Sequence, residues 1–254
     1  RLADPTWWAN LRQRVDGWPV GVRLLLATLR QGASLDELPR TFGGWSPAVR
    51  QYFAEEVLGR PESLPPVIDL LRTSLVQRFC GPLCEAVCGT EFDGSAFMRT
   101  VANGGLPCTP VDEHGEWYRY HPLFREFLQR LLDIRYSPAE IANWQGAAAD
   151  WFEAHGLLMD AVPHALAAGG PSAVTRLLVR HRNLLISREQ RYRLARCLRA
   201  LSPDTLENDV DLLLMKAWLF YHQGRHLETP AVLDRIDSLL TRDDETVDPA
   251  ARRV

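Results

Sequence analysis

The side chain best suited to bind a ligand is His121, which follows Arg119 and Tyr120 and directly precedes Pro122. An imidazole at the start of a helix can donate a hydrogen bond to a phosphate or carboxylate oxygen, more strongly when it is protonated. Pro122 suits the first helical position, where a missing N–H costs little. A lone histidine beside apolar residues more often packs in a core, so binding and packing both remain open from these residues alone.

A second candidate is the tripeptide Gly17-Trp18-Pro19, which separates two expected helices at 4–16 and 20–31. Glycine and proline together favour a sharp turn, and Pro19 could do no more than end a helix. Elsewhere the chain offers no paired carboxylates, no nucleophile–histidine arrangement and no metal cluster. The sequence therefore predicts no catalytic residue and no enzyme.

Three of the cysteines lie close enough in the sequence for a metal site to be considered. Cys80, Cys84 and Cys88 are four residues apart, so they share one helix face, but this spacing matches no standard zinc pattern. We expect small buried hydrophobes and no metal. An odd total of five cysteines without a secretory signal indicates a reducing compartment, and we expect a cytoplasmic protein.

Bulk composition excludes several classes of protein. The 254 residues are 46% hydrophobic, which is ample for burying cores, and the formal net charge is −3. A near-neutral charge argues against a large nucleic-acid footprint. No run of about 18 apolar residues predicts a membrane helix, so no membrane partner is expected. Because the first residue is Arg1, we expect an internal piece of a longer protein.

Hydrophobic spacing predicts helices through most of the first half, followed by a change of period. Further helices are expected at 35–38, 48–58, 67–75, 81–87 and 95–102. Two short strands are expected at 106–111 and 116–120, joined by the turn Asp112–Gly115, and an amphipathic helix then begins after His121. Helices, a hairpin and another helix follow the order of a winged-helix domain.

Winged helices often bind DNA, but the charges here argue against it. The helix at 95–102 offers only Arg99 to a groove, and the wing carries Asp112, Glu113 and Glu116, which phosphates would repel. We therefore expect no direct DNA contact by this part of the chain.

From Ser137 onward the pattern is helical almost to the end. Six helices are expected at 137–155, 160–168, 171–181, 188–201, 210–223 and 229–240, and residues 241–254 are expected to be a frayed or truncated end. Short paired helices broken by Gly or Pro favour a helical-repeat solenoid over an ordinary bundle, and Ala217–Arg225 is similar to a tetratricopeptide (TPR) helix and its turn. The fold class predicted is mainly α, with a winged helix followed by a TPR-like arm.

Several short sequence segments, taken in their order along the chain, resemble those of a known family. They are Gly17–Gly21, Glu55–Leu58, Leu71–Ser74, Gly81–Cys84, Trp117–Phe124, Ala147–Gly156 and His164–Gly169. This series resembles the large ATP-binding LuxR-type transcriptional activators, the MalT-like group among the STAND nucleotide switches. The resemblance implies a helical lid domain at 1–46, a winged-helix domain at 47–136 and the start of a sensor arm at 137–254.

The same resemblance implies three cofactor-binding positions. Gly17 and Pro19 match a glycine-x-proline element whose proline packs against adenine, and His121 matches a histidine that contacts the β-phosphate of ADP. Tyr120 and Pro122 replace the residues that usually flank this histidine, so only its own role transfers. These contacts are expected in the longer parent protein with ATP or ADP; in this chain, which has no phosphate-binding loop, we expect no cofactor and a His121 that faces solvent or a neighbouring helix.

The predicted function is the regulatory middle portion of an ATP/ADP-controlled, inducer-responsive bacterial transcription activator. Its winged helix would hold the ADP-bound resting state as a lid. The expected partners are the upstream nucleotide-binding domain, an inducer on the helical arm and further copies of the parent protein. The alternative is a helical-repeat module that binds a protein or ligand and has no nucleotide role.

Overall fold

A two-stranded antiparallel hairpin interrupts an otherwise helical chain, which confirms the mainly α fold class with a short wing. The structure, a computed structural model, describes residues 9, 12, 14–30, 32, 34, 38–59, 66–186, 191–199 and 201–246. The chain divides into two compact units, residues 1–148 and 149–254, and the division falls within one helix, α9.

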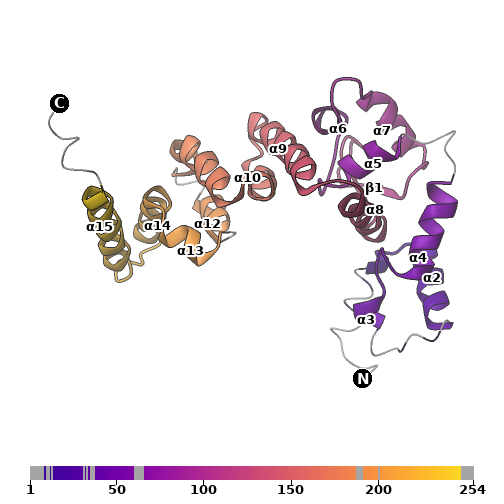
Figure 1. Cartoon of the computed structure of the whole chain (residues 1–254), viewed down its shortest axis with the longest axis horizontal. Helices are drawn as coiled ribbons and strands as arrows, with labels where there is room; N and C mark the ends of the chain where they lie inside the picture. Colours follow the sequence, from indigo (N-terminus) through magenta and orange to yellow (C-terminus); the bar gives the residue numbers. More distant parts are fainter. Residues whose placement is uncertain are drawn as a thin grey trace. The chain divides into compact units, whose positions relative to one another are not determined.

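Unit 1 is built from short helices around the hairpin (Figure 1). Its elements are α2 (Pro19–Arg30), α3 (Leu38–Thr41), α4 (Pro47–Tyr52), the π-helical turn η1 (Phe53–Val57), α5 (Val67–Thr73), α6 (Gly81–Cys88), α7 (Gly94–Ala102), β1 (Cys108–Pro110), β2 (Tyr118–Tyr120), α8 (Pro122–Arg135) and α9 (Pro138–Ala154). Gly89 ends α6 with a φ of 102°, a backbone conformation that glycine adopts without strain.

The hairpin has the register of a winged-helix wing. Cys108 pairs with Tyr120 and Pro110 with Tyr118, and an isolated bridge joins Phe79 to Tyr118 on the other side. Phe79, which lies between α5 and α6, thus pairs with the hairpin where the first strand of a winged-helix sheet would pair. The Asp112 carboxylate accepts hydrogen bonds from the Glu116 and Trp117 amides and holds the wing turn. One of the acidic side chains expected to repel DNA therefore has a structural role.

Helix α8 lies at the centre of unit 1. Its apolar face is buried: Leu123, Phe124 and Leu128 have no exposed surface. The Arg125 guanidinium donates to the carbonyl oxygens of Ser74, Leu75 and Val76, so it satisfies the backbone that follows α5. The turn before α4 also approaches α8 closely, because a Cβ on Gly44 would lie 2.4 Å from the Leu123 carbonyl oxygen.

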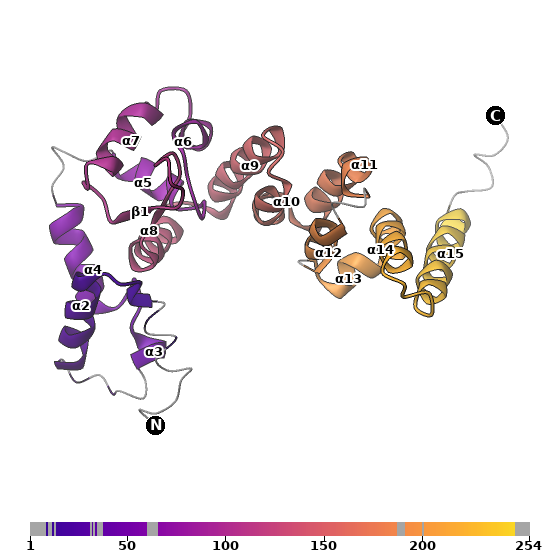
Figure 2. The same ribbon diagram turned by 180° about the vertical axis from the view of Figure 1, so that it is seen from behind.

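Unit 2 consists of helices packed in sequence order. They are α10 (Leu158–Arg180), α11 (Arg182–Leu185), α12 (Arg191–Arg199), α13 (Pro203–Glu207), α14 (Val210–His222) and α15 (Thr229–Thr246). Figures 1 and 2 show α14 and α15 side by side, and Leu213, Ala217, Val232 and Ile236 form the buried cluster between them. The expected helix–turn–helix around Gly224, whose φ is 73°, is therefore present, whereas its membership of the TPR class stays a prediction.

Several boundaries differ from those expected. The helices predicted at 160–168 and 171–181 form α10, in which Gly170 alone has a non-helical backbone, so the predicted break is real. Helices α11 and α13 were not predicted, because four or five residues show too little periodicity. Helix α15 continues to Thr246, so the frayed end predicted from 241 was wrong over 241–246. Ser46 holds the N-cap position of α4, but its hydroxyl donates to the Gly43 carbonyl.

Some predictions concern residues outside the part that the structure describes. They are the start of the helix at 4–16, of which residues 9, 12, 14 and 15 are helical, the segment 35–37, the start of the helix at 188–201, and the tail at 247–254.

Candidate functional site

The structure brings the two sequence candidates together at a junction formed by residues 15–18 and 119–121. The His121 Nε2–H donates to the Val15 carbonyl oxygen at 2.9 Å, and Nδ1 accepts from the Leu123 amide at 3.3 Å as the N-cap of α8. These two partners dictate the neutral Nε2–H tautomer, because a carbonyl can only accept and an amide N–H can only donate. Both ring nitrogens are thus used inside unit 1.

A reversal of the backbone makes this contact possible. Asp16 and Gly17 have φ values of 45° and 74°, and Asp16 is the one non-glycine residue with positive φ among those described. The reversal ends the preceding helix and leaves the Val15 carbonyl directed at His121. Pro19 is then the first residue of α2, where its fixed φ suits a helix start.

Trp18 joins the two halves of the junction through ring contacts. Its centroid lies 4.7 Å from that of His121 and 5.7 Å from that of Phe53, with the Phe53 ring nearly parallel. Behind His121, the buried Tyr120 hydroxyl hydrogen bonds to Thr73 at 2.7 Å. The junction therefore rests directly on the aromatic core of unit 1.

Charge and burial act on His121 in opposite directions. Burial lowers its pKa below the ordinary value, while the hydrogen bond to Val15 and the Asp16 carboxylate oppose this shift and Arg119 adds to it. Arg119 and Asp16 form an ion pair at 2.7 Å across the same junction. His121 is 4% exposed, so of the two surroundings expected for it, solvent or a neighbouring helix, solvent is wrong: it contacts Val15 at the end of the helix before the 15–18 turn.

The two other predicted residues face outward. Gly17 and Pro19 are exposed, whereas Trp18 between them turns in toward His121. Next to Pro19, a groove of about 690 Å³ is lined by α2 together with Tyr52 and Glu56. Arg23 and Arg30 lie along this groove, so it combines an apolar wall with positive charge.

Sequence reasoning found His121 and the Gly17–Pro19 turn but missed their partners. A backbone carbonyl such as that of Val15 leaves no signal in a sequence. The one signal in the sequence for this contact is the opposite charge of Asp16 and Arg119, each of which lies next to a candidate motif. The Thr73–Tyr120 hydrogen bond joins residues 47 positions apart, and nothing local predicts it.

Cys80, Cys84 and Cys197 are buried thiols, and Cys88 and Cys108 are partly buried. Cys84 is 1% exposed, and burial raises its pKa well above the ordinary value; burial also raises the pKa of Cys88 to about 12. Among the described residues, no group of three or more His, Cys, Asp or Glu side chains is placed to hold a metal ion. Over the same residues, no helix combines the length and apolarity that crossing a membrane requires.

Comparison with known families agrees with the winged-helix arrangement. Residues 54–141 match the family described as the MalT winged helix domain. This range runs from η1 into α9 and includes the wing and His121. The chain therefore contains a winged-helix domain of the MalT type.

Similarity to curated proteins extends beyond that domain. The chain is 30% identical over 236 residues to the HTH-type transcriptional regulator MalT of Cronobacter sakazakii, covering 92% of this chain and 26% of that protein. It is 29% identical over 240 residues to MalT of Klebsiella pneumoniae, covering 94% and 26%. It is also 29% identical over 234 residues to the serine/threonine-protein kinase PknK of Mycobacterium tuberculosis, covering 91% and 21%.

These comparisons confirm the predicted resemblance: the chain is similar to the MalT transcriptional regulators over most of its own length, and residues 54–141 match the MalT winged helix domain. It spans about a quarter of the length of the MalT proteins that it matches and about a fifth of PknK. The family match at 54–141 overlaps the winged-helix domain predicted at 47–136, while the division at 46 and 136 stays a prediction.

Proposed function

We propose that this chain is the regulatory middle portion of a nucleotide-controlled, inducer-responsive transcription activator, with the winged helix acting as a lid that holds the ADP-bound resting state. Gly17 and Pro19 would contact the nucleotide, and the winged helix would respond through His121. The upstream nucleotide-binding domain would be the lid's partner, and release of the lid would allow self-association.

The observation that carries this proposal is the direct link between the exposed Gly17–Pro19 turn and the start of α8. A ligand that moved this turn would pull on the Val15 carbonyl and so on the His121 Nε2–H, which is 2.9 Å away. A phosphate oxygen could replace the carbonyl as acceptor for the same N–H, because both are strong acceptors. His121 would then exchange one partner for another when the nucleotide changes.

The groove beside Pro19 supports the same proposal. Leu26, which lines the groove, is 46% exposed although it is apolar, and Val22, 45% exposed, lies on the same helix outside the groove lining. An apolar helix face that also carries Arg23 and Arg30 suits a domain that holds a nucleotide, since it offers both packing surface and positive charge.

The similarity to the kinase PknK does not lead us to propose kinase activity for this chain. Protein kinases hold the phosphates of ATP with a lysine on a strand. The one lysine of this sequence is Lys216, which lies on helix α14. A regulatory role therefore explains the similarity to both MalT and PknK more simply than phosphoryl transfer does.

The test is the substitution His121→Ala in the longer protein that includes the nucleotide-binding domain. We expect less ADP retained through gel filtration and more self-association without inducer, because the lid loses its contact. Thr73→Val is the matched control, since it removes the buried hydrogen bond of the adjacent Tyr120 and leaves both hydrogen bonds of His121 in place. If both variants retain ADP like the wild type while remaining folded, the lid proposal is wrong.

The alternative function is a helical-repeat module that binds a ligand or protein and has no nucleotide role. One observation favours it: His121 already has a partner on each ring nitrogen within this chain. On this alternative, His121→Ala would lower the stability of unit 1 and leave ADP retention unchanged.

A further inference from the structure

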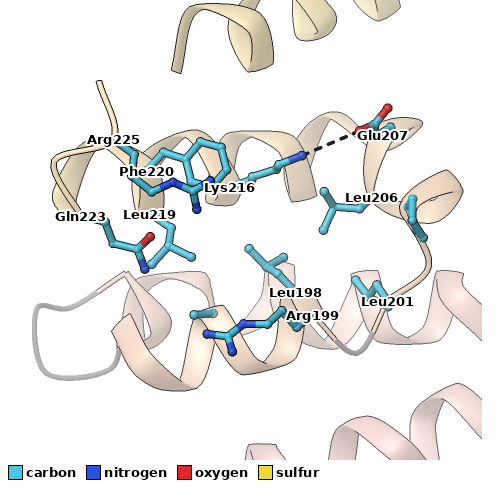
Figure 3. A pocket seen from close by; sticks show the side chains of 12 residues that line it. Leu198, Arg199, Leu201, Leu206, Glu207, Lys216, Leu219, Phe220, Gln223 and Arg225 are labelled. Atoms are coloured by element: carbon cyan, nitrogen blue, oxygen red, sulfur yellow. Dashed lines mark ion pairs between the residues drawn. The ribbon is translucent and has the colours of Figure 1, made fainter. Parts of the chain in front are cut away.

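Unit 2 contains a hollow that neither the family match nor the sequence motifs assign to any function. It lies between α12, α13 and α14 and has a volume of about 390 Å³, within the range that small-molecule sites occupy (Figure 3). Helix α13 has only five residues, so it covers one end of the crevice between the two longer helices.

The walls of the hollow are apolar. Figure 3 shows Leu198 from α12, Leu206 from α13 and Leu219 from α14 directed into it. Each of these leucines is less than 10% exposed, so they belong to the core of unit 2 and are held by it. The ring of Phe220 lies at the edge, with the Arg225 guanidinium 3.8 Å from its centroid. The site therefore offers a rigid apolar floor of leucine side chains.

The rim is polar and mainly basic. Arg199, Lys216 and Arg225 line it together with one carboxylate, that of Glu207. Arg225 is neutralised by an ion pair with Glu228, and the Lys216 amine is 3.9 Å from Glu207, at the outer limit of an ion pair. Arg199 has no ion pair with any residue in the described part of the chain. The rim thus carries one unmatched positive charge.

We propose that this pocket binds a small organic carboxylate with an aromatic or alkyl tail. The carboxylate would pair with Arg199, because a guanidinium fork matches a carboxylate in geometry and charge. The tail would lie over Leu198 and Leu219. A neutral sugar fits less well, since the one carboxylate that could accept from its hydroxyls already faces Lys216.

This inference deepens the proposed function, because an inducer-responsive regulator needs a place that receives the signal. The biological role of the pocket rests on the proposed function, but ligand binding does not: the pocket belongs to unit 2, and binding to it requires no nucleotide. A failure to bind would leave the lid proposal standing, and a failure of the lid would leave the pocket standing.

The composition of the chain supplies a selective probe. Lys216 is the sole lysine, so an amine-acylating reagent forms stable amides only at this side chain and at the terminal amine. We would acylate the 254-residue chain in the presence of 4-phenylbutyrate, of its neutral amide and of acetate, and follow both amines by mass spectrometry. We expect 4-phenylbutyrate to slow acylation of Lys216 at least about fivefold relative to the terminal amine, and the amide and acetate to have much smaller effects.

A matched pair of variants tests the role of charge. Arg199→Gln should weaken protection by 4-phenylbutyrate roughly tenfold, as loss of one charge-assisted contact predicts. Arg196→Gln is the control, because Arg196 is exposed on the same helix but does not line the pocket. The rise in the midpoint of thermal unfolding with 4-phenylbutyrate gives a second measure of binding. The proposal is overturned by an absence of both effects, by equal protection from the neutral amide, or by equal losses in the two variants.

Discussion

The junction at residues 15–18 and 119–121 and the pocket between α12, α13 and α14 use polar side chains in opposite ways. At the junction, His121 and Tyr120 are buried and each polar atom of their side chains has a partner inside unit 1. At the pocket, Arg199 and Gln223 are exposed, and neither forms a side-chain hydrogen bond within the described residues. The first region completes a core, and the second presents donors to solvent.

This difference shows that a sequence motif can fall on residues whose side chains already have partners within the chain, so a ligand there must replace one of those partners. The junction carries the residues that a sequence motif marks, yet its contacts are those that stabilise a fold. The pocket carries no motif, yet two of its donors, Arg199 and Gln223, have no side-chain partner among the described residues. If this comparison is right, changes at the junction cost stability, whereas changes at the pocket rim cost binding alone.

The largest effect is expected from Phe53→Ala, in the core beneath the junction. Phe53 has no exposed surface and contacts the rings of Trp18, Phe124 and Phe127. Removing a buried phenyl ring leaves a cavity, so the free energy of unfolding of unit 1 should fall by about 3–5 kcal/mol. Urea unfolding followed by tryptophan fluorescence measures it. Val111→Ala on the exposed wing is the control, and equal losses in both variants would contradict a core role for Phe53.

An intermediate effect is expected from His121→Asn, with a defined pH dependence. Losing one of the two hydrogen bonds should lower the free energy of unfolding by about 1–3 kcal/mol at neutral pH. Because the pKa of His121 is lowered in the folded chain, the unfolded chain takes up a proton at higher pH. Wild-type stability should therefore be greatest above pH ~6.5 and decline below it.

The same pH series separates His121 from the other titrating groups. The difference in stability between wild type and His121→Asn should shrink as the pH falls from 7 to 5, since protonation removes the acceptor at Nδ1. Asp16 and Arg119 are unchanged in both proteins, so they cancel in this difference. A difference that stays constant over this range would show that the pKa of His121 is the same in the folded and unfolded chains, which would contradict the lowered pKa.

The smallest effect on stability is expected from Arg199→Gln at the pocket rim. An exposed side chain without an ion pair should change the free energy of unfolding by no more than about 0.5 kcal/mol. Thermal unfolding of the chain without added ligand measures this directly. A loss of 2 kcal/mol or more would place Arg199 among the structural residues and would remove the contrast between the two regions.

Much of the fold follows from local signals. The turn at Asp112–Gly115, the strands beside it and Pro122 predicted the wing and the start of α8, and all are present. The Gly169-Gly170 pair predicted a break that the structure shows at Gly170. The bridge at Phe79 and the short helices α11 and α13 escaped prediction, because each is too short for a period to appear and each depends on partners distant in the sequence.

The sequence by itself determined the order of the elements, the mainly α class and the resemblance to MalT-like regulators, because hydrophobic period, glycine and proline act locally and leave a readable pattern. Only the tertiary structure decided that His121 is neutral, buried and bonded to Val15, since that contact joins residues 106 positions apart through a backbone carbonyl. It also decided that Lys216 and Arg199 border one hollow. Which donors are satisfied and which remain free depends on packing, and packing is absent from a linear pattern.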